Sequence, residues 1–89
     1  MKRLTIKVSG RVQGVFYRAK ANEIANQMGL TGLVRNEPDG SVYLEAQGEE
    51  KAVDAFVEWC RKGPSRAKVE SVLIEAAALK KEDSFRVVH

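Results

Sequence analysis

The chain has 89 residues, of which 44% are hydrophobic and 30% are charged, and it carries a formal net charge of +3. This composition is typical of a globular protein and excludes an intrinsically disordered chain. Apolar runs are shorter than the roughly 18 residues of a membrane-spanning helix, and the start of the chain lacks the apolar segment of a secretory signal. Because Cys60 is the only cysteine, no internal disulfide can form, and we expect a cytoplasmic protein without membrane contacts.

Alternation and helical spacing define the elements of the first half of the chain. In residues 3–9 (RLTIKVS) every second side chain is apolar, which predicts a half-buried strand. Apolar residues recur at helical spacing over 17–28, and Gly29 then provides a C-terminal stop. Residues 31–36 and 41–47 are predicted to be strands of one hairpin, joined by EPDG, whose proline and glycine fit a type I turn.

The second half repeats the pattern with one helix and two strands. A helix is predicted from about Glu49 to Lys62, with acidic residues in its first turn and basic residues in its last. A strand follows over 67–76, where the change in parity between Val69 and Val72 predicts a β-bulge. The predicted apolar face of the helix consists of Val53, Phe56, Val57 and Cys60. A short last strand, SFRVVH, is predicted to bury Phe85 and Val87.

The order of these elements is βαββαβ with a short C-terminal strand. It predicts an α/β (α+β) protein with a ferredoxin-like sandwich, in which a mixed, mostly antiparallel sheet carries two helices on one face. No repeat or linker divides the chain, so we expect residues 1–89 to form a single domain.

Side chains that commonly perform catalysis are scarce. His89 is the only histidine and the last residue, so we expect a frayed terminus there, and Cys60 falls on an apolar helix face, where a buried thiol is expected. Acidic residues do not cluster at spacings that would bind a metal ion. Proteins of similar topology stack RNA bases on aromatic residues of the central strands, but here only Tyr43 is available. Covalent catalysis, metal catalysis and base stacking are therefore not predicted.

The segment GRVQGVFYR, residues 10–18, is the most informative stretch of the chain. It lacks the spacing and the lysine of a P-loop, and a plain strand-to-helix connection is one interpretation of it. However, Gly10 and Gly14 let the backbone curl, and the N–H groups of a helix start attract anions. Arg18 has the wrong charge for the start of a helix, and its planar guanidinium can bind two phosphate oxygens. These features favour an anion-binding loop.

Three segments together, GRVQGVFYR, GLTGLVRNEPDGSV and GPSRAKVESV, resemble the acylphosphatase family of small ferredoxin-like hydrolases of carboxyl phosphates. The resemblance covers residues 4–88. It implies that Arg18 and the loop amides bind the phosphate, that Asn36 positions the attacking water, and that no metal or organic cofactor takes part. The implied loop residues are Arg11, Val12, Gln13, Gly14, Val15, Phe16 and Tyr17.

The expected partner is then a small-molecule acyl phosphate, bound by a monomer that binds no nucleic acid. Asn36 ends a predicted strand, and a position of that strand next to the first strand would bring the side chain against the loop. Two alternatives stay open. Asn36 can simply initiate the turn before Glu37 and Pro38, and the loop can belong to a non-catalytic phosphate- or RNA-binding module of ferredoxin-like fold.

Overall fold

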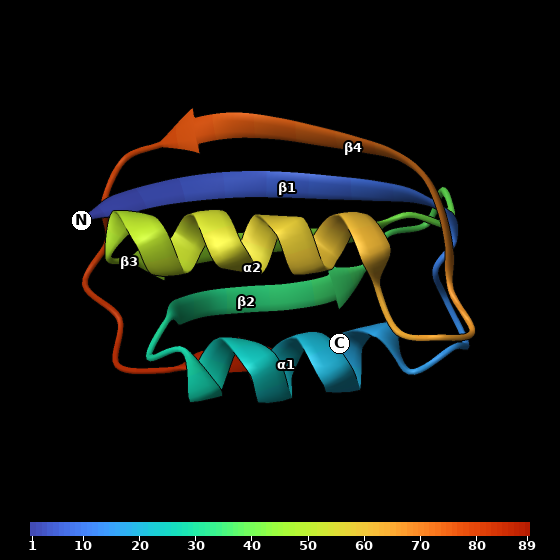
Figure 1. Cartoon of the computed structure of the whole chain (residues 1–89), viewed down its shortest axis with the longest axis horizontal. Coiled ribbons are helices and arrows are strands. Elements are labelled where there is room, and N and C mark those ends of the chain that lie inside the picture. Colours follow the sequence, from blue (N-terminus) through green and yellow to red (C-terminus); the bar gives the residue numbers. More distant parts are fainter.

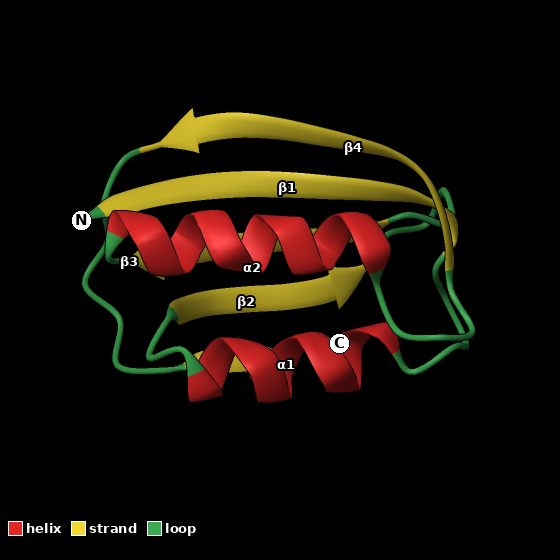
Figure 2. Ribbon diagram, in the orientation of Figure 1, coloured by secondary structure: helices red, strands yellow, loops and turns green.

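The computed structural model describes residues 1–89 and shows five strands in one sheet, with both helices packed on one face of it (Figures 1 and 2). The elements are β1 (Lys2–Arg11), α1 (Tyr17–Gln27), β2 (Thr31–Asn36), β3 (Val42–Gly48), α2 (Glu50–Lys62), β4 (Lys68–Ala77) and β5 (Phe85–Val87). This order confirms the predicted ferredoxin-like class with its additional C-terminal strand. Neither helix is long and apolar enough to cross a membrane.

The strand order in the sheet is β4-β1-β3-β2-β5, so the expectation that β2 lies next to β1 is wrong. β3 lies between them and pairs antiparallel with both, which makes β1 and β2 parallel to each other. Their C-terminal ends therefore meet at the same edge of the sheet (Figure 1). In the last row of this edge, Val8 of β1 is paired with Val42, and Val42 is paired with Asn36 of β2. Two strand spacings, about 10 Å, separate Asn36 from β1.

The predicted bulge is present in β4 and shapes the end of β1. Pairing of β1 with β4 shifts after Ser9, which faces Ser71, because Gly10 then faces Val69 and leaves Glu70 without a partner. At Gly10 the two backbones come so close that a Cβ atom would collide with the carbonyl oxygen of a β4 residue, and the φ angle is +125°. Only glycine fits this approach, which turns the chain toward the loop before α1.

The helices bury the faces that the sequence predicted. All four apolar residues named for the second helix are buried, and α2 begins one residue later than predicted, at Glu50. The thiol of Cys60 is fully buried, and burial raises its pKa to about 12. At this pKa the thiol stays protonated at neutral pH, so it behaves as a small apolar side chain of the core.

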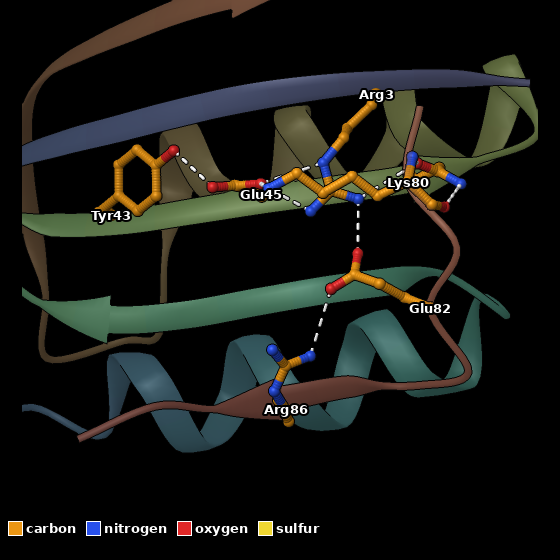
Figure 3. A network of polar contacts seen from close by, with 7 residues as sticks. Arg3, Tyr43, Glu45, Lys80, Glu82 and Arg86 are labelled. Carbon is orange, nitrogen blue, oxygen red and sulfur yellow. Dashed lines mark hydrogen bonds and ion pairs between the residues drawn. The ribbon is translucent and has the colours of Figure 1, made fainter. Parts of the chain in front are cut away.

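A buried arginine organises the opposite face of the sheet (Figure 3). Arg3 alternates with the apolar residues of β1, so its side chain points away from the helices, yet only 2% of it is exposed. Its guanidinium lies 2.6 Å from carboxylate oxygens of both Glu45 and Glu82, and it also donates to Gln47. Glu82 belongs to the connection between β4 and β5, and the side-chain amide of Gln47 exchanges hydrogen bonds with the backbone of Lys80 in the same connection. The cluster therefore fastens this connection to the sheet.

The two carboxylates of the cluster are ionised at neutral pH. Burial disfavours the charged form of Glu45, but hydrogen bonds from Tyr43 and Arg3 outweigh burial and lower its pKa to about 2. The pKa of Glu82 is also lowered, since its hydrogen bonds from Arg3 and Arg86 outweigh burial. Both groups thus stabilise the folded state above their unfolded pKa of about 4.3, and this contribution is lost as the pH falls through the folded values.

Replacing Arg3 by methionine removes the buried cation between Glu45 and Glu82 and leaves them only their more exposed partners, Lys80 and Arg86. We expect the free energy of unfolding at pH 7 to fall by about 3–5 kcal/mol, measured by urea denaturation. The wild-type protein should also lose stability between about pH 5 and 2, whereas protonation relieves the repulsion in the variant. The difference between the two proteins should therefore narrow in acid.

Arg61→Met is the matched control for this experiment. Its guanidinium is half exposed and pairs only with Glu58, one helical turn away. We expect a change of less than about 0.5 kcal/mol in this variant. Equal unfolding midpoints for Arg3→Met and Arg61→Met at pH 7 would show that the buried cluster stabilises no more than a surface ion pair does.

Candidate active site

The loop between β1 and α1, residues 12–16, presents backbone N–H groups that have no partner in the protein. No N–H from Val12 to Ala19 donates a hydrogen bond, and the first helical bond runs from Lys20 to the carbonyl oxygen of Phe16. Gly14 and Phe16 have φ angles of +73° and +66°, which bend the loop. Phe16 is the N-cap of α1 and provides no capping hydrogen bond. The loop and the positive end of the helix dipole thus form a site that favours anions.

Contacts with the hydrophobic core and with a neighbouring turn hold this loop in place. Val12 and Val15 are buried in the hydrophobic core. The side-chain amide of Gln13 donates to the carbonyl oxygens of Glu37 and Ser41, both at 2.9 Å, in the turn between β2 and β3. The loop is therefore fixed to the same turn that follows Asn36, which restricts its backbone without using its N–H groups.

Tyr17 fixes the end of the loop to α2. Its hydroxyl donates to the backbone oxygen of Cys60 at 2.7 Å, and its ring centroid lies 5.2 Å from that of Trp59. Burial, with smaller contributions from the neighbouring side chain of Cys60, raises the pKa of Tyr17 far above its usual range. The hydroxyl is thus a permanently protonated anchor and takes no part in proton transfer.

The loop, α1 and the ends of β2 and β5 enclose a pocket of about 440 Å³. It is lined by Val12, Gly14, Phe16, Tyr17, Arg18, Ala19, Asn36, Val87 and His89. Arg18 is the one lysine or arginine in this lining, and no aspartate or glutamate side chain belongs to it. The lining therefore offers a cation, free N–H groups and apolar surface, a combination that fits an anion with an apolar substituent.

Six of the nine residues proposed from the sequence line this pocket, and three do not. Arg11 is exposed at the end of β1, opposite Lys68 of β4. Gln13 points to the turn between β2 and β3, and Val15 lies in the core. The sequence predicted that these three residues bind phosphate through their backbone, so their side chains are free for other contacts. The side chains of Gln13 and Val15 hold the loop, and Arg11 lies where the loop begins.

Sequence reasoning missed Ala19, Val87 and His89 as pocket residues. Val87 lies in β5, which pairs parallel with β2 opposite Val34. His89 was expected at a frayed terminus, but its Nδ1 lies 3.4 Å from Nη1 of Arg18. In Figure 1 the C-terminal end lies beside the first turns of α1. β2 and β5 lie far apart in the sequence, and no local pattern predicts that they pair in parallel. Of the three missed residues, only Ala19 could have been predicted to line the pocket, from its position in the first turn of the helix after the loop.

Asn36 carries the one buried side-chain oxygen or nitrogen in the chain without a hydrogen-bond partner, its Oδ1 atom. It ends β2 in the same row as Val8 and Val42, which are fully buried on the helix side of the sheet. A buried polar atom without a partner is unfavourable, and such atoms in native proteins call for an explanation. A pocket that admits water or a ligand to this atom provides one.

No group of three or more histidine, cysteine, aspartate or glutamate side chains lies close enough to hold a metal ion. The polar chemistry of the pocket comes instead from Arg18, Asn36, His89 and the backbone.

Comparison with known proteins identifies the family. The family description "Acylphosphatase" matches residues 4–87. An acylphosphatase of Methylococcus capsulatus is 51% identical over 79 residues, which cover 89% of this chain and 86% of that protein. An acylphosphatase of Marinobacter nauticus is 46% identical and covers 100% of this chain and 98% of its own. The crystal structure of an acylphosphatase from Bacillus subtilis superimposes with a TM-score of 0.96 at 34% identity, over 100% of both chains.

Titration with inorganic phosphate should perturb the backbone amide signals of residues 12–19 in ¹H–¹⁵N NMR spectra, because these N–H groups are free to donate to an anion. The Arg18→Met variant should show the same fold and much smaller shifts at equal phosphate concentration. Arg61→Met, which changes the net charge equally on α2, should titrate like the wild type. Shifts that spread over other elements and spare the loop would contradict an anion site at this position.

Proposed function

The chain belongs to the acylphosphatase family, and on this premise we propose how it hydrolyses acyl phosphates to a carboxylate and orthophosphate. Arg18 and the loop amides hold the phosphoryl group, Asn36 positions the water, and no metal ion takes part. One observation carries the proposal: Asn36, whose buried Oδ1 has no hydrogen-bond partner in the chain, lines the same pocket as Arg18. Binding alone would need the cation and the amides, whereas an orphan acceptor beside them suits a water molecule.

Arg18 and the loop amides bind the phosphoryl oxygens. The guanidinium donates two parallel N–H bonds to two of these oxygens, and the N–H groups of the loop and of the first turn of α1 donate to the others. Charge on these oxygens is present in the substrate and persists in the transition state, so these donors contribute to both binding and catalysis. Because Gln13 and Tyr17 anchor the loop, the donors need little reorganisation when the substrate enters.

Asn36 orients the attacking water. Its Oδ1 accepts a hydrogen bond from the water, whose oxygen then attacks phosphorus in line with the bond to the acyl oxygen. The new bond joins the water oxygen to phosphorus, and the bond between phosphorus and the acyl oxygen breaks. The leaving group departs with its electron pair as a carboxylate, and the protons of the water pass to orthophosphate and solvent.

The leaving group explains why such a simple site suffices. A carboxylic acid has a pKa of about 4, so its anion leaves at neutral pH without a general acid. A site without a paired acid and base is thus adequate for acyl phosphates, and it is inadequate for phosphate esters of alcohols, whose leaving groups need protonation. The expected substrate is therefore a carboxyl phosphate.

The remaining features of the proposal concern the state of the protein. We propose that residues 1–89 act as one acylphosphatase-like domain and as a cytoplasmic monomer that needs no nucleic acid. The single cysteine, Cys60, is buried and unpaired, which suits a reducing compartment. On the open face, the ring of Tyr43 lies 4.5 Å below the guanidinium of Arg35, so it is already covered where a base would stack.

Hydrolysis of benzoyl phosphate should proceed at the same rate with and without EDTA, because the proposed site uses only protein donors. Phosphate release is the measurement, with the uncatalysed rate subtracted. Loss of activity in EDTA and its recovery with Mg²⁺ would contradict metal independence. Phosphate binding without any turnover would identify a binding module in place of a hydrolase.

The two proposed side chains should fail in different ways. Asn36→Ala should lower kcat by about 10²–10³ with little change in KM, since it removes an oriented group that acts on the water. Arg18→Met should raise KM and also lower kcat, because the phosphoryl charge exists in both states.

Steady-state kinetics with benzoyl phosphate measures both variants, and Asn22→Ala, on α1 but not among the residues that line the pocket, serves as the control for Asn36→Ala. If Asn36→Ala keeps wild-type kcat with the fold intact, the assignment of the water to Asn36 is wrong.

A further inference from the structure

Phe16 combines two unfavourable features at one position. Its φ angle of +66° makes it the one residue other than glycine with a left-handed backbone. Its side chain is 67% exposed, although it is a large aromatic ring. Bulky residues rarely adopt this backbone conformation, and exposure of a ring to water forgoes the benefit of burial. Conformational strain of this kind persists where it serves a function.

The folded chain does not compensate for these costs. The hydrophobic core and the partly buried residues packed on it do not include Phe16, and the ring forms none of the aromatic pairs that join Tyr17, Phe56, Trp59 and Phe85. The residue also caps α1 without a side-chain hydrogen bond. Phe16 is instead one of the residues that line the pocket.

The pocket has more room and more apolar surface than a phosphoryl group uses. Its volume of about 440 Å³ falls within the range of small-molecule sites. Besides Arg18, Asn36, His89 and the loop N–H groups, its lining is apolar and includes Phe16 and Val87, and Arg18 is its one lysine or arginine. An acyl group attached to the bound phosphoryl group must occupy this space, and a second negative charge there would meet no lysine or arginine other than Arg18.

We propose that Phe16 is a specificity residue that contacts the acyl group, and that the preferred substrates are acyl phosphates with an uncharged apolar, especially aromatic, acyl group. This inference rests on the proposed hydrolysis of acyl phosphates. An aromatic acyl group offers a ring that can stack on Phe16 or meet its edge, whereas an acetyl group offers one methyl. The ring of Phe16 should therefore stabilise the transition state for aromatic substrates selectively.

The test compares kcat/KM for benzoyl phosphate and acetyl phosphate in the wild type, Phe16→Ala and Phe16→Leu. In Phe16→Ala the ratio of kcat/KM for benzoyl phosphate to kcat/KM for acetyl phosphate should fall about tenfold. Phe16→Leu, which keeps an apolar side chain, should fall between Phe16→Ala and the wild type. The inhibition constant of inorganic phosphate, measured in all three proteins, reports separately on the loop N–H groups, so that a change in the substrate ratio is assigned to the acyl group.

Leu73→Ala is the matched control, since Leu73 is also a large exposed apolar residue, 61% exposed, but it lies on β4 outside the pocket. Its substrate ratio should equal that of the wild type. Equal losses for both substrates in Phe16→Ala, or no loss for either, would overturn the role of Phe16 and leave the hydrolase itself standing. If the wild type hydrolysed neither substrate, the proposed hydrolysis of acyl phosphates would itself be contradicted, and the role of Phe16 with it.

Phe16→Gly separates the ring from the backbone. Glycine accepts a positive φ without strain, so this variant should melt a few degrees higher than Phe16→Ala, which keeps the strain. Both variants should show the same loss of selectivity for benzoyl phosphate. A melting temperature of Phe16→Gly below that of Phe16→Ala, together with unchanged selectivity, would show that the ring serves the fold and would overturn the proposal.

Discussion

The fold keeps one set of polar groups without hydrogen-bond partners in the chain, and the rest of the structure depends on this constraint. The N–H groups from Val12 to Ala19 and Oδ1 of Asn36 all meet at one edge of the sheet, and each would gain free energy by turning toward a partner elsewhere in the chain. The surrounding packing prevents this. Gln13 bonds to the adjacent turn and Tyr17 to the backbone of α2, while apolar side chains of the loop fill the core. The loop is thus fixed through its side chains, and its backbone stays available for an anion.

Contacts on the far side of the sheet, around Arg3, also help to position the pocket. Arg3 holds the connection between β4 and β5 through Glu82, and this connection determines where β5 pairs with β2. β5 in turn brings Val87 into the wall of the pocket, and the chain beyond it brings His89 next to Arg18. A buried ion pair rarely adds net stability over apolar packing, but it does specify one arrangement of the segments it joins. Here that arrangement completes one side of the site.

Local patterns were sufficient to predict the elements and the loop, because strand alternation, helical spacing and glycine positions are written in adjacent residues. They could not predict that β3 separates β1 from β2, since strand order depends on contacts between distant segments. Asn36 shares the parity of Val34, which signals a polar side chain on the core face, yet its lack of a partner becomes visible only in three dimensions. Gln13 gave no signal at all, because its partners are backbone carbonyls of another turn. Burial of Arg3 was likewise unpredictable, since the segment that covers it is far away in the sequence.

The identity of the N-cap residue links binding with selectivity. Serine or aspartate at this position would accept hydrogen bonds from the first N–H groups of α1 and compete with a phosphoryl group for them. Aspartate would also repel it. Phe16 leaves these donors free and adds an apolar surface at the point where they end. Since the phosphoryl group is common to all acyl phosphates, its donors cannot distinguish one substrate from another, and discrimination must come from residues that border the donors. A strained, exposed aromatic residue at the start of α1 meets both requirements, which accounts for its presence where folding alone would favour glycine or a capping residue.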